Sequence, residues 1–141
     1  MAQFGTPPSD GEPIERPGAY GIALDKDQVF LVQWNGNFYL PGGALESGER
    51  PEDALRREIL EETGYEVMRS LPLCTAQQYT VHEPTGRAVN KLCAFFRVRL
   101  GPQTGHPARD HEPRWIDVAE ADYLMKEDAS KWALKEATAD R

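Results

Sequence analysis

The segment over residues 51–64 constrains the fold most, because it begins with proline and ends with glycine. Pro51 suits the first position of a helix, where its missing N–H would have no partner, and Gly64 suits the residue just past the end. Two acidic residues follow Pro51 directly, and carboxylates are favoured at the positive end of the helix dipole. The sequence therefore predicts a helix over Pro51–Thr63.

Three glutamates of this segment share one side of the predicted helix. Since successive helical residues are about 100° apart, Glu58, Glu61 and Glu62 fall within an arc of about 100°. Like charges at these spacings repel, so packing alone does not favour them. One interpretation is a solvated helix face on which Arg57 offsets part of the charge. The other is a site for Mg²⁺ or Mn²⁺, because these cations prefer oxygen ligands.

Apolar segments on both sides of this helix predict strands. Asn35 and Gly36 suit a type I′ turn, because both tolerate positive φ, and the turn joins two of these segments. The predicted strands are Gly18–Asp25, Gln28–Trp34 and Asn37–Leu40 before the helix, and Val67–Thr75, Gln77–His82, Asn90–Leu100 and Arg114–Ile116 after it. Residues 101–113 are predicted to be a loop, and Ala119–Ala137 to be one or two amphipathic helices. This order of elements predicts an α/β fold with a mixed sheet.

The length and composition indicate one domain. A chain of 141 residues can bury a sufficient core without metal or disulfide support. Residues 1–17 contain four prolines and few apolar side chains, which predicts a flexible or extended lead-in to a domain over residues 18–141. The two cysteines, Cys74 and Cys93, match neither a disulfide framework nor a zinc-finger spacing, so we expect reduced thiols in the cytoplasm.

The net charge and the distribution of basic residues indicate which classes of partner are expected. The net charge is −7, and no run of basic residues is longer than the pair Arg56–Arg57. A nucleic-acid polymer is therefore an unexpected partner, because its phosphates need clustered cations. The uninterrupted apolar stretches, such as Leu92–Phe96, have the length of strands, so neither secretion nor a membrane span is expected. A small phosphorylated ligand remains possible if a divalent metal joins it to acidic groups.

The residues from Gly43 to Tyr65 carry a more specific pattern. The spacing is glycine, five residues, glutamate, seven residues, Arg-Glu, an aliphatic residue, any residue, Glu-Glu, any residue and glycine. The positions are Gly43, Glu49, Arg57, Glu58, Ile59, Glu61, Glu62 and Gly64. This pattern closely resembles the Nudix box of the Nudix hydrolase family. Only Tyr65 departs from it, where an aliphatic residue is usual, and we expect this change to affect packing rather than chemistry.

The resemblance implies a fold in which a mixed β-sheet is sandwiched between α-helices. It also implies that Mg²⁺ or Mn²⁺ and water cleave a diphosphate bond in a nucleoside diphosphate linked to a group X. The family's metal positions match Glu58, Glu61 and Glu62, together with the backbone carbonyl of Gly42. Arg57 matches the residue that orients these glutamates, and Glu49 matches one that braces the loop or helps to hold metal. Glu58 is one candidate for the general base.

A later acid is a second candidate for the base. Asp110, His111 and Glu112 precede Trp115, and Glu112 with Trp115 resembles a Glu-x-x-Trp element of many relatives. Glu112 is therefore predicted to contribute to catalysis, against the alternative that it is a solvated loop acid. His111 is interpreted as a surface residue.

The group X is less constrained by the sequence. Trp34, Phe38, Tyr79 and Phe96 lie on predicted strands and are candidates for stacking on a base, although aromatic residues more often serve the core. Trp34, Phe38 and Tyr79 are the predicted substrate contacts. Markers of other subfamilies are largely missing downstream of the box, which favours a nucleoside triphosphate or a small nucleotide derivative. The alternatives are an ADP-sugar or dinucleoside polyphosphate hydrolase, or a nucleotide-binding module without catalysis. A homodimer is possible.

Overall fold

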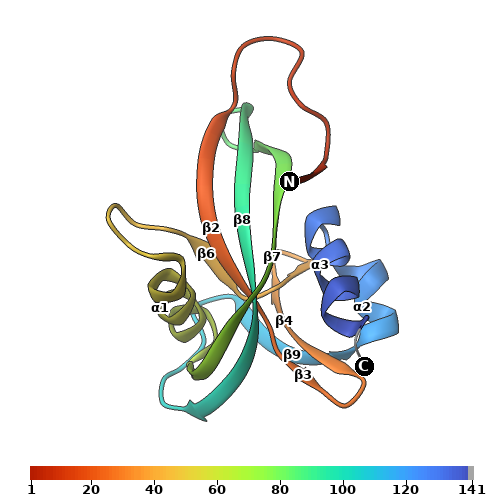
Figure 1. Ribbon diagram of the computed structural model, residues 1–141. Coiled ribbons are helices and arrows are strands. Elements are labelled where there is room, and N and C mark those ends of the chain that lie inside the picture. Colours follow the sequence, from red (N-terminus) through yellow and green to blue (C-terminus); the bar gives the residue numbers. More distant parts are fainter. Residues whose placement is uncertain (140–141) are drawn as a thin grey trace.

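The computed structural model describes residues 1–139 and consists of two β-sheets with helices on opposite sides (Figure 1). The strands are β1 (Ala2–Phe4), β2 (Ile14–Ile22), β3 (Leu24–Asp25), β4 (Gln28–Trp34), β5 (Asn37–Tyr39), β6 (Gly42–Ala44), β7 (Tyr65–His82), β8 (Arg87–Gln103) and β9 (His111–Asp117). The helices are α1 (Pro51–Thr63), α2 (Val118–Leu124) and α3 (Asp128–Thr138). None of these helices within residues 1–139 is long and apolar enough to cross a membrane.

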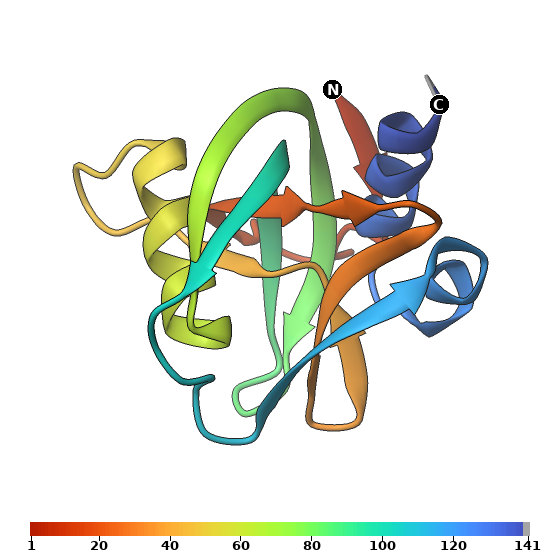
Figure 2. The same ribbon diagram turned by 90° about the horizontal axis from the view of Figure 1, so that it is seen from below.

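The larger sheet has five strands in the order β1-β7-β8-β2-β6. β2 runs parallel to β8 and β1 parallel to β7, whereas the other pairs of this sheet are antiparallel. In the smaller sheet β4 pairs with β3, β5 and β9. Helix α1 lies on one side of the strands, and α2 and α3 lie on the other, as both views show (Figure 1, Figure 2). The predicted mixed sheet between helices is therefore confirmed.

Two apolar clusters hold these layers together. Leu55 and Ile59 of α1 are fully buried in one cluster, against Ala19, Phe30 and other residues of the sheets. The second cluster lies under α2 and α3 and includes Leu31, Phe95 and Leu134. Fully burying a Leu or Ile side chain contributes about 1.5–3 kcal/mol, so α1 is firmly attached to the strands.

The predicted bounds of α1 are confirmed. Gly64 ends the helix with a φ of 79°, and its N–H donates to the carbonyl of Leu60 at 2.9 Å. A Cβ at Gly64 would lie 2.3 Å from the carbonyl oxygen of Gly105, so the neighbouring chain also excludes a side chain here. Tyr65 follows at once and packs edge-on against Phe30, with ring centroids 5.5 Å apart. The unusual residue of the box thus has a packing role.

The amino-terminal segment differs from the flexible or extended lead-in predicted over residues 1–17. Ala2–Phe4 forms β1, whose partner is β7, and β2 already begins at Ile14. β1 adds a short edge strand. β2 pairs with β8 from its first residue, since Ile14 lies opposite Val89. These strands depend on partners more than 70 residues away, which local composition does not reveal. The division into residues 1–17 and 18–141 stays a prediction.

The later strands are longer than the sequence predicts. β7 is continuous through Ala76, where two strands are expected, because Ala76 is fully buried and paired with Cys93 of β8. β8 extends to Gln103 and β9 begins at His111, so the predicted loop over residues 101–113 shortens to 104–110. Pairing with all of β4 extends β9 beyond the predicted Arg114–Ile116. The predicted helical segment Ala119–Ala137 consists of α2 and α3.

Candidate active site

The acidic helix begins after a short strand and a loop that bring the backbone close to it. β6 pairs antiparallel with β2, so that Gly42 lies opposite Tyr20 and Gly43 opposite Ala19. Gly42 has a φ of 144°, and a Cβ there would lie 2.1 Å from the carbonyl oxygen of Ala19. A side chain is therefore excluded at Gly42, and β6 can place its backbone beside the glutamates of α1.

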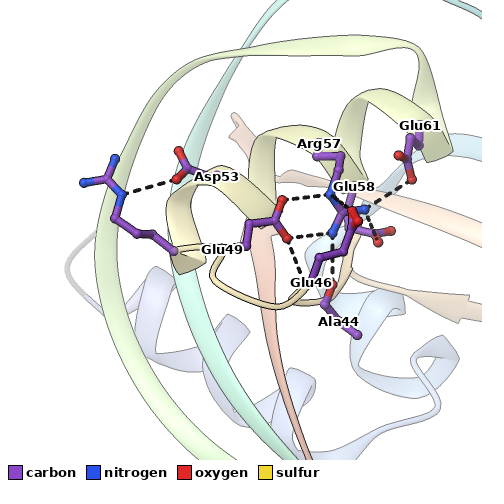
Figure 3. Close-up of polar contacts among 8 residues, drawn as sticks. Ala44, Glu46, Glu49, Asp53, Arg57, Glu58 and Glu61 are labelled. Atoms are coloured by element: carbon purple, nitrogen blue, oxygen red, sulfur yellow. Dashed lines mark hydrogen bonds and ion pairs between the residues drawn. The ribbon is translucent and has the colours of Figure 1, made fainter.

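Arg57 is at the centre of a network of acidic side chains (Figure 3). Its guanidinium donates to both carboxylate oxygens of Glu49, at 2.8 and 2.9 Å, and to Oε1 of Glu58 at 2.9 Å. It also reaches Oε2 of Glu61 at 3.5 Å and the carbonyl of Ala44 at 3.1 Å. The hydrogen bonds from Arg57, followed by the backbone N–H of Glu46, lower the pKa of Glu49 to about 2. Arg57 thus joins the loop before α1 to two of the predicted metal ligands.

Glu62 is held differently, by the backbone of β6. Its Oε1 accepts a hydrogen bond from the N–H of Gly42 at 2.8 Å. The pKa of Glu62 is raised to about 8: burial is the main cause, the Gly42 hydrogen bond opposes it, and the charges of Glu58 and Glu61 add to it. Burial also raises the pKa of Glu58, although Arg57 opposes this effect. The site therefore gathers negative charge that its own cation only partly neutralises.

These residues fit a hard divalent cation in their chemistry. Within residues 1–139, no three His, Cys, Asp or Glu side chains form a ready-made metal cluster. The reason is that Arg57 engages Glu58 and Glu61, whereas Glu62 turns to Gly42. Burial is the main cause of the raised pKa of half-buried Glu62, and the charges of Glu58 and Glu61 add to it; a cation beside these carboxylates would offset their mutual repulsion. Carboxylate and carbonyl oxygens are also the ligands that Mg²⁺ prefers, so the donor set fits.

A groove of about 750 Å³ opens directly beside this site. Gly42, Gly43 and Glu62 line it where it meets the box. Strands β2, β7 and β8, the β4–β5 hairpin and the start of α3 form its walls, and among the lining side chains are Tyr20, Trp34, Tyr39, Gln78, Lys91 and Glu127. Its volume is in the range of pockets that hold small ligands.

Only one of the three predicted substrate contacts lies in this groove. Trp34 is 42% exposed and stacks on His111, with ring centroids 5.8 Å apart and an angle of 25° between the planes. Phe38 instead packs against the apolar cluster under α2 and α3. The hydroxyl of Tyr79 contacts Gln77 at 3.4 Å, and its strand neighbours Gln78 and Thr80 line the groove in its place. The structure therefore does not bring Phe38 and Tyr79 to the groove.

Glu112 lies on β9 rather than on the predicted loop. It is opposite Gln33 of β4, and its carboxylate pairs with Arg114 at 3.5 Å. Neighbouring strand residues point to opposite faces, and His111 lines the groove, so Glu112 faces away from it. The carboxylate of Glu112 pairs with Arg114, whereas those of Glu58 and Glu61 bind Arg57 and that of Glu62 binds the N–H of Gly42. The structure does not group Glu112 with Glu58, Glu61 and Glu62.

The sequence interpretation missed several side chains of the groove. Lys91 and His111 line it, as do Tyr39 and Glu127. The sequence alone indicates only a surface position for His111, because it does not show the contact with Trp34, which lies 77 positions earlier in the chain. The sequence does contain a signal for Lys91. It lies two residues from Val89 and from Cys93, both of which are buried, and residues two apart on a strand face the same side.

Comparisons with known proteins agree with this architecture. Chains of solved structures share the fold: a NUDIX hydrolase from Nitrosomonas europaea has a TM-score of 0.70 at 17% identity, with 92% of this chain and 90% of that chain covered. A MutT protein from Bacillus halodurans has a TM-score of 0.69 at 25% identity, with 85% of this chain and 80% of that chain covered. In both comparisons the matched region extends well beyond the box.

Among curated proteins, the nucleoside triphosphatase NudI of Escherichia coli O139:H28 is 47% identical over 57 residues, which are 39% of this chain and 38% of NudI. The matched part thus spans less than two fifths of the length of that relative. The family model for the NUDIX domain matches residues 15–137, which include both sheets except β1 and nearly all of the helical residues. This chain therefore belongs to the NUDIX family.

Proposed function

We propose that this protein hydrolyses a diphosphate bond in a nucleoside triphosphate or a small nucleotide derivative, with Mg²⁺ or Mn²⁺ as cofactor. The observation that carries the proposal is the position of Glu62, which belongs to the acidic cluster of α1 and also lines the groove. A nucleotide in the groove would therefore have its phosphates beside the glutamates. The intact set of acids in the box favours an enzyme over a module that binds nucleotides without cleaving them.

Glu58, Glu61 and Glu62, with the carbonyl of Gly42, would hold the metal. When bound, the cation offsets the negative charge of the diphosphate and lowers the pKa of water. Arg57 keeps Glu58 and Glu61 oriented through its hydrogen bonds, and Glu49 fixes the guanidinium from the other side. Glu49 therefore acts on the site through Arg57. Preorganised charges of this kind cost no rearrangement during the reaction.

Glu58 is our favoured general base. It lies within the acidic cluster, and burial raises the pKa of its carboxyl above the ordinary value against the effect of Arg57, which makes it a stronger proton acceptor than an ordinary glutamate. Glu112 is the second candidate, and its exposed ion pair with Arg114 favours it less. Trp34 supplies an aromatic face at the groove on which a base can stack.

The name of the relative NudI, a nucleoside triphosphatase, supports a nucleoside triphosphate as substrate over the region that matches. ADP-sugars and dinucleoside polyphosphates remain the alternatives. A cytoplasmic location and a homodimer stay predictions.

The experiment is a phosphate-release screen of nucleoside triphosphates, ADP-sugars, dinucleoside polyphosphates and NADH, each with Mg²⁺ and with Mn²⁺. Adding inorganic pyrophosphatase to parallel samples of the triphosphates identifies pyrophosphate as a product. ADP-sugars, dinucleoside polyphosphates and NADH yield nucleotides or sugar phosphates, so alkaline phosphatase is added to those samples to convert these products to free phosphate. Glu62→Gln is the control, because it removes one charge at nearly unchanged volume. Metal-dependent release that is lost in Glu62→Gln supports the proposal. Binding of nucleotides without hydrolysis in the whole screen would instead indicate a binding module.

A further inference from the structure

An ion pair crosses the wall of the groove at a distance from the box in the sequence. Lys91 lies on β8, and Glu127 immediately precedes α3; Nζ of Lys91 and Oε2 of Glu127 are 2.6 Å apart. Their side chains are only 24% and 15% exposed, yet both residues line the groove. The pair is therefore accessible mainly from the space that we assign to the nucleotide.

Glu127 does not use its carboxylate for the helix that it precedes. It is the N-cap residue of α3, but no side-chain hydrogen bond caps this helix. The N–H of Ala129 in the first turn donates instead to Oε1 of Gln78 on β7, at 2.9 Å. Because Gln78 satisfies this donor, the carboxylate of Glu127 is directed to Lys91.

Tyr20 connects the pair with the acidic cluster. Its side chain is partly buried, and burial is the main cause that raises the pKa of its hydroxyl. The charges of Glu127 and Glu62 both add to this effect, so the ring lies within electrostatic reach of the ion pair and of the α1 glutamates. All three residues line the same groove. Since Glu62, Lys91 and Glu127 line one groove, a nucleotide that has its phosphates at Glu62 can reach the ion pair along this groove.

On the basis of the proposed nucleotide hydrolysis, we propose that Lys91 and Glu127 determine base specificity and favour guanine over adenine. The ammonium of Lys91 has three N–H donors, of which one is used by Glu127, and the carboxylate of Glu127 has acceptor sites left. Guanine has its O6 acceptor beside the N1–H and N2–H donors, so it can form three hydrogen bonds with the pair. Adenine has a donor where guanine has O6, and it can form at most two.

A charge swap separates this role from a purely structural tether between β8 and α3. The double variant Lys91→Glu/Glu127→Lys keeps one cation and one anion in contact but exchanges the donor and acceptor positions. A tether would be restored by the swap, whereas base recognition would be reversed. The single variants Lys91→Met and Glu127→Gln remove one charge each at similar side-chain length.

The measurements are kcat/KM for GTP and ATP, the Kd of GMP and AMP without metal, and the thermal unfolding midpoint. We expect the wild type to favour guanine by about tenfold or more in both ratios, or about 1.4 kcal/mol, because guanine can form one more charge-assisted hydrogen bond with the pair than adenine can. Each single variant should lose most of this preference. The swap should recover the unfolding midpoint and favour adenine.

The matched control is Asp122→Lys/Lys135→Glu, which swaps an exposed pair between α2 and α3, 3.7 Å apart and outside the groove. It should leave both ratios unchanged. Guanine-to-adenine ratios that stay constant in the Lys91 and Glu127 variants would overturn the inference, even if hydrolysis is intact. If the wild type hydrolyses neither triphosphate but GMP and AMP binding still responds to the swap, the proposed hydrolysis is wrong and the base recognition stands.

Discussion

Replacing Gly43 with alanine would test whether the position of Glu58 determines the rate. The backbone at Gly43 is not in the positive-φ region, so alanine is conformationally acceptable there. Its Cβ would lie 2.6 Å from both Cδ and Oε2 of Glu58. The three atoms nearest to the added methyl group all belong to the flexible side chain of Glu58.

The size of the effect follows from this contact. Nonbonded carbon atoms prefer a separation of at least about 3.5 Å, so the Glu58 carboxylate must retreat by roughly 1 Å. A misplacement of that size can lower a rate by about 10²-fold. The fold should lose only about 1 kcal/mol, because Glu58 can rotate away from a partly exposed ion pair with Arg57. In a domain of this size, that corresponds to a decrease of about 3 °C in the unfolding midpoint.

The assay measures kcat for the best substrate of the screen, together with thermal unfolding of the same samples. Gly11→Ala is the matched control: a Cβ at Gly11 would contact nothing within 4 Å, its positive φ of 69° adds only backbone strain, and it lies outside the groove. This variant should keep its kcat. A Gly43→Ala enzyme with kcat within threefold of the wild type would refute the reasoning, and so would a loss of kcat that unfolding fully explains.

Three further outcomes are expected. In EDTA, the free energy of unfolding of the wild type should fall as the pH rises from 4.5 to about 8, because the pKa of Glu62 is raised and the fold disfavours its charged form. Urea unfolding of Glu62→Gln should not show this decrease, and equal pH profiles of the two proteins would contradict the prediction. Millimolar Mg²⁺ or Mn²⁺ should raise the unfolding midpoint through binding to the native state, and EDTA should stop hydrolysis; an unchanged melting curve with EDTA-resistant turnover argues against a metal site. In steady-state kinetics, Glu58→Gln should lower kcat by about 10²- to 10⁴-fold and by more than Glu112→Gln does, whereas the reverse order would make Glu112 the base.

The sequence by itself determined the elements whose signals are local. Pro51 and Gly64 predict both ends of α1, because each residue acts on the backbone within one turn of the helix. The spacing of the glutamates identifies one acidic face for the same reason, since positions three and four apart are neighbours on any helix. The Asn35–Gly36 turn is equally local, and β4 and β5 pair across it.

Only the tertiary structure decided which residues meet across the groove. The contact of Trp34 with His111 and that of Lys91 with Glu127 join strands and a helix that are far apart in the sequence. Phe38, Tyr79 and Glu112 have suitable chemistry, but strand register turns their side chains to other surroundings. A shift of one residue in register exchanges the two faces of a strand, and register depends on the pairing of distant strands. The proposed base contacts therefore follow from the packed sheets, whereas the proposed carboxylate ligands of the metal follow from one helix.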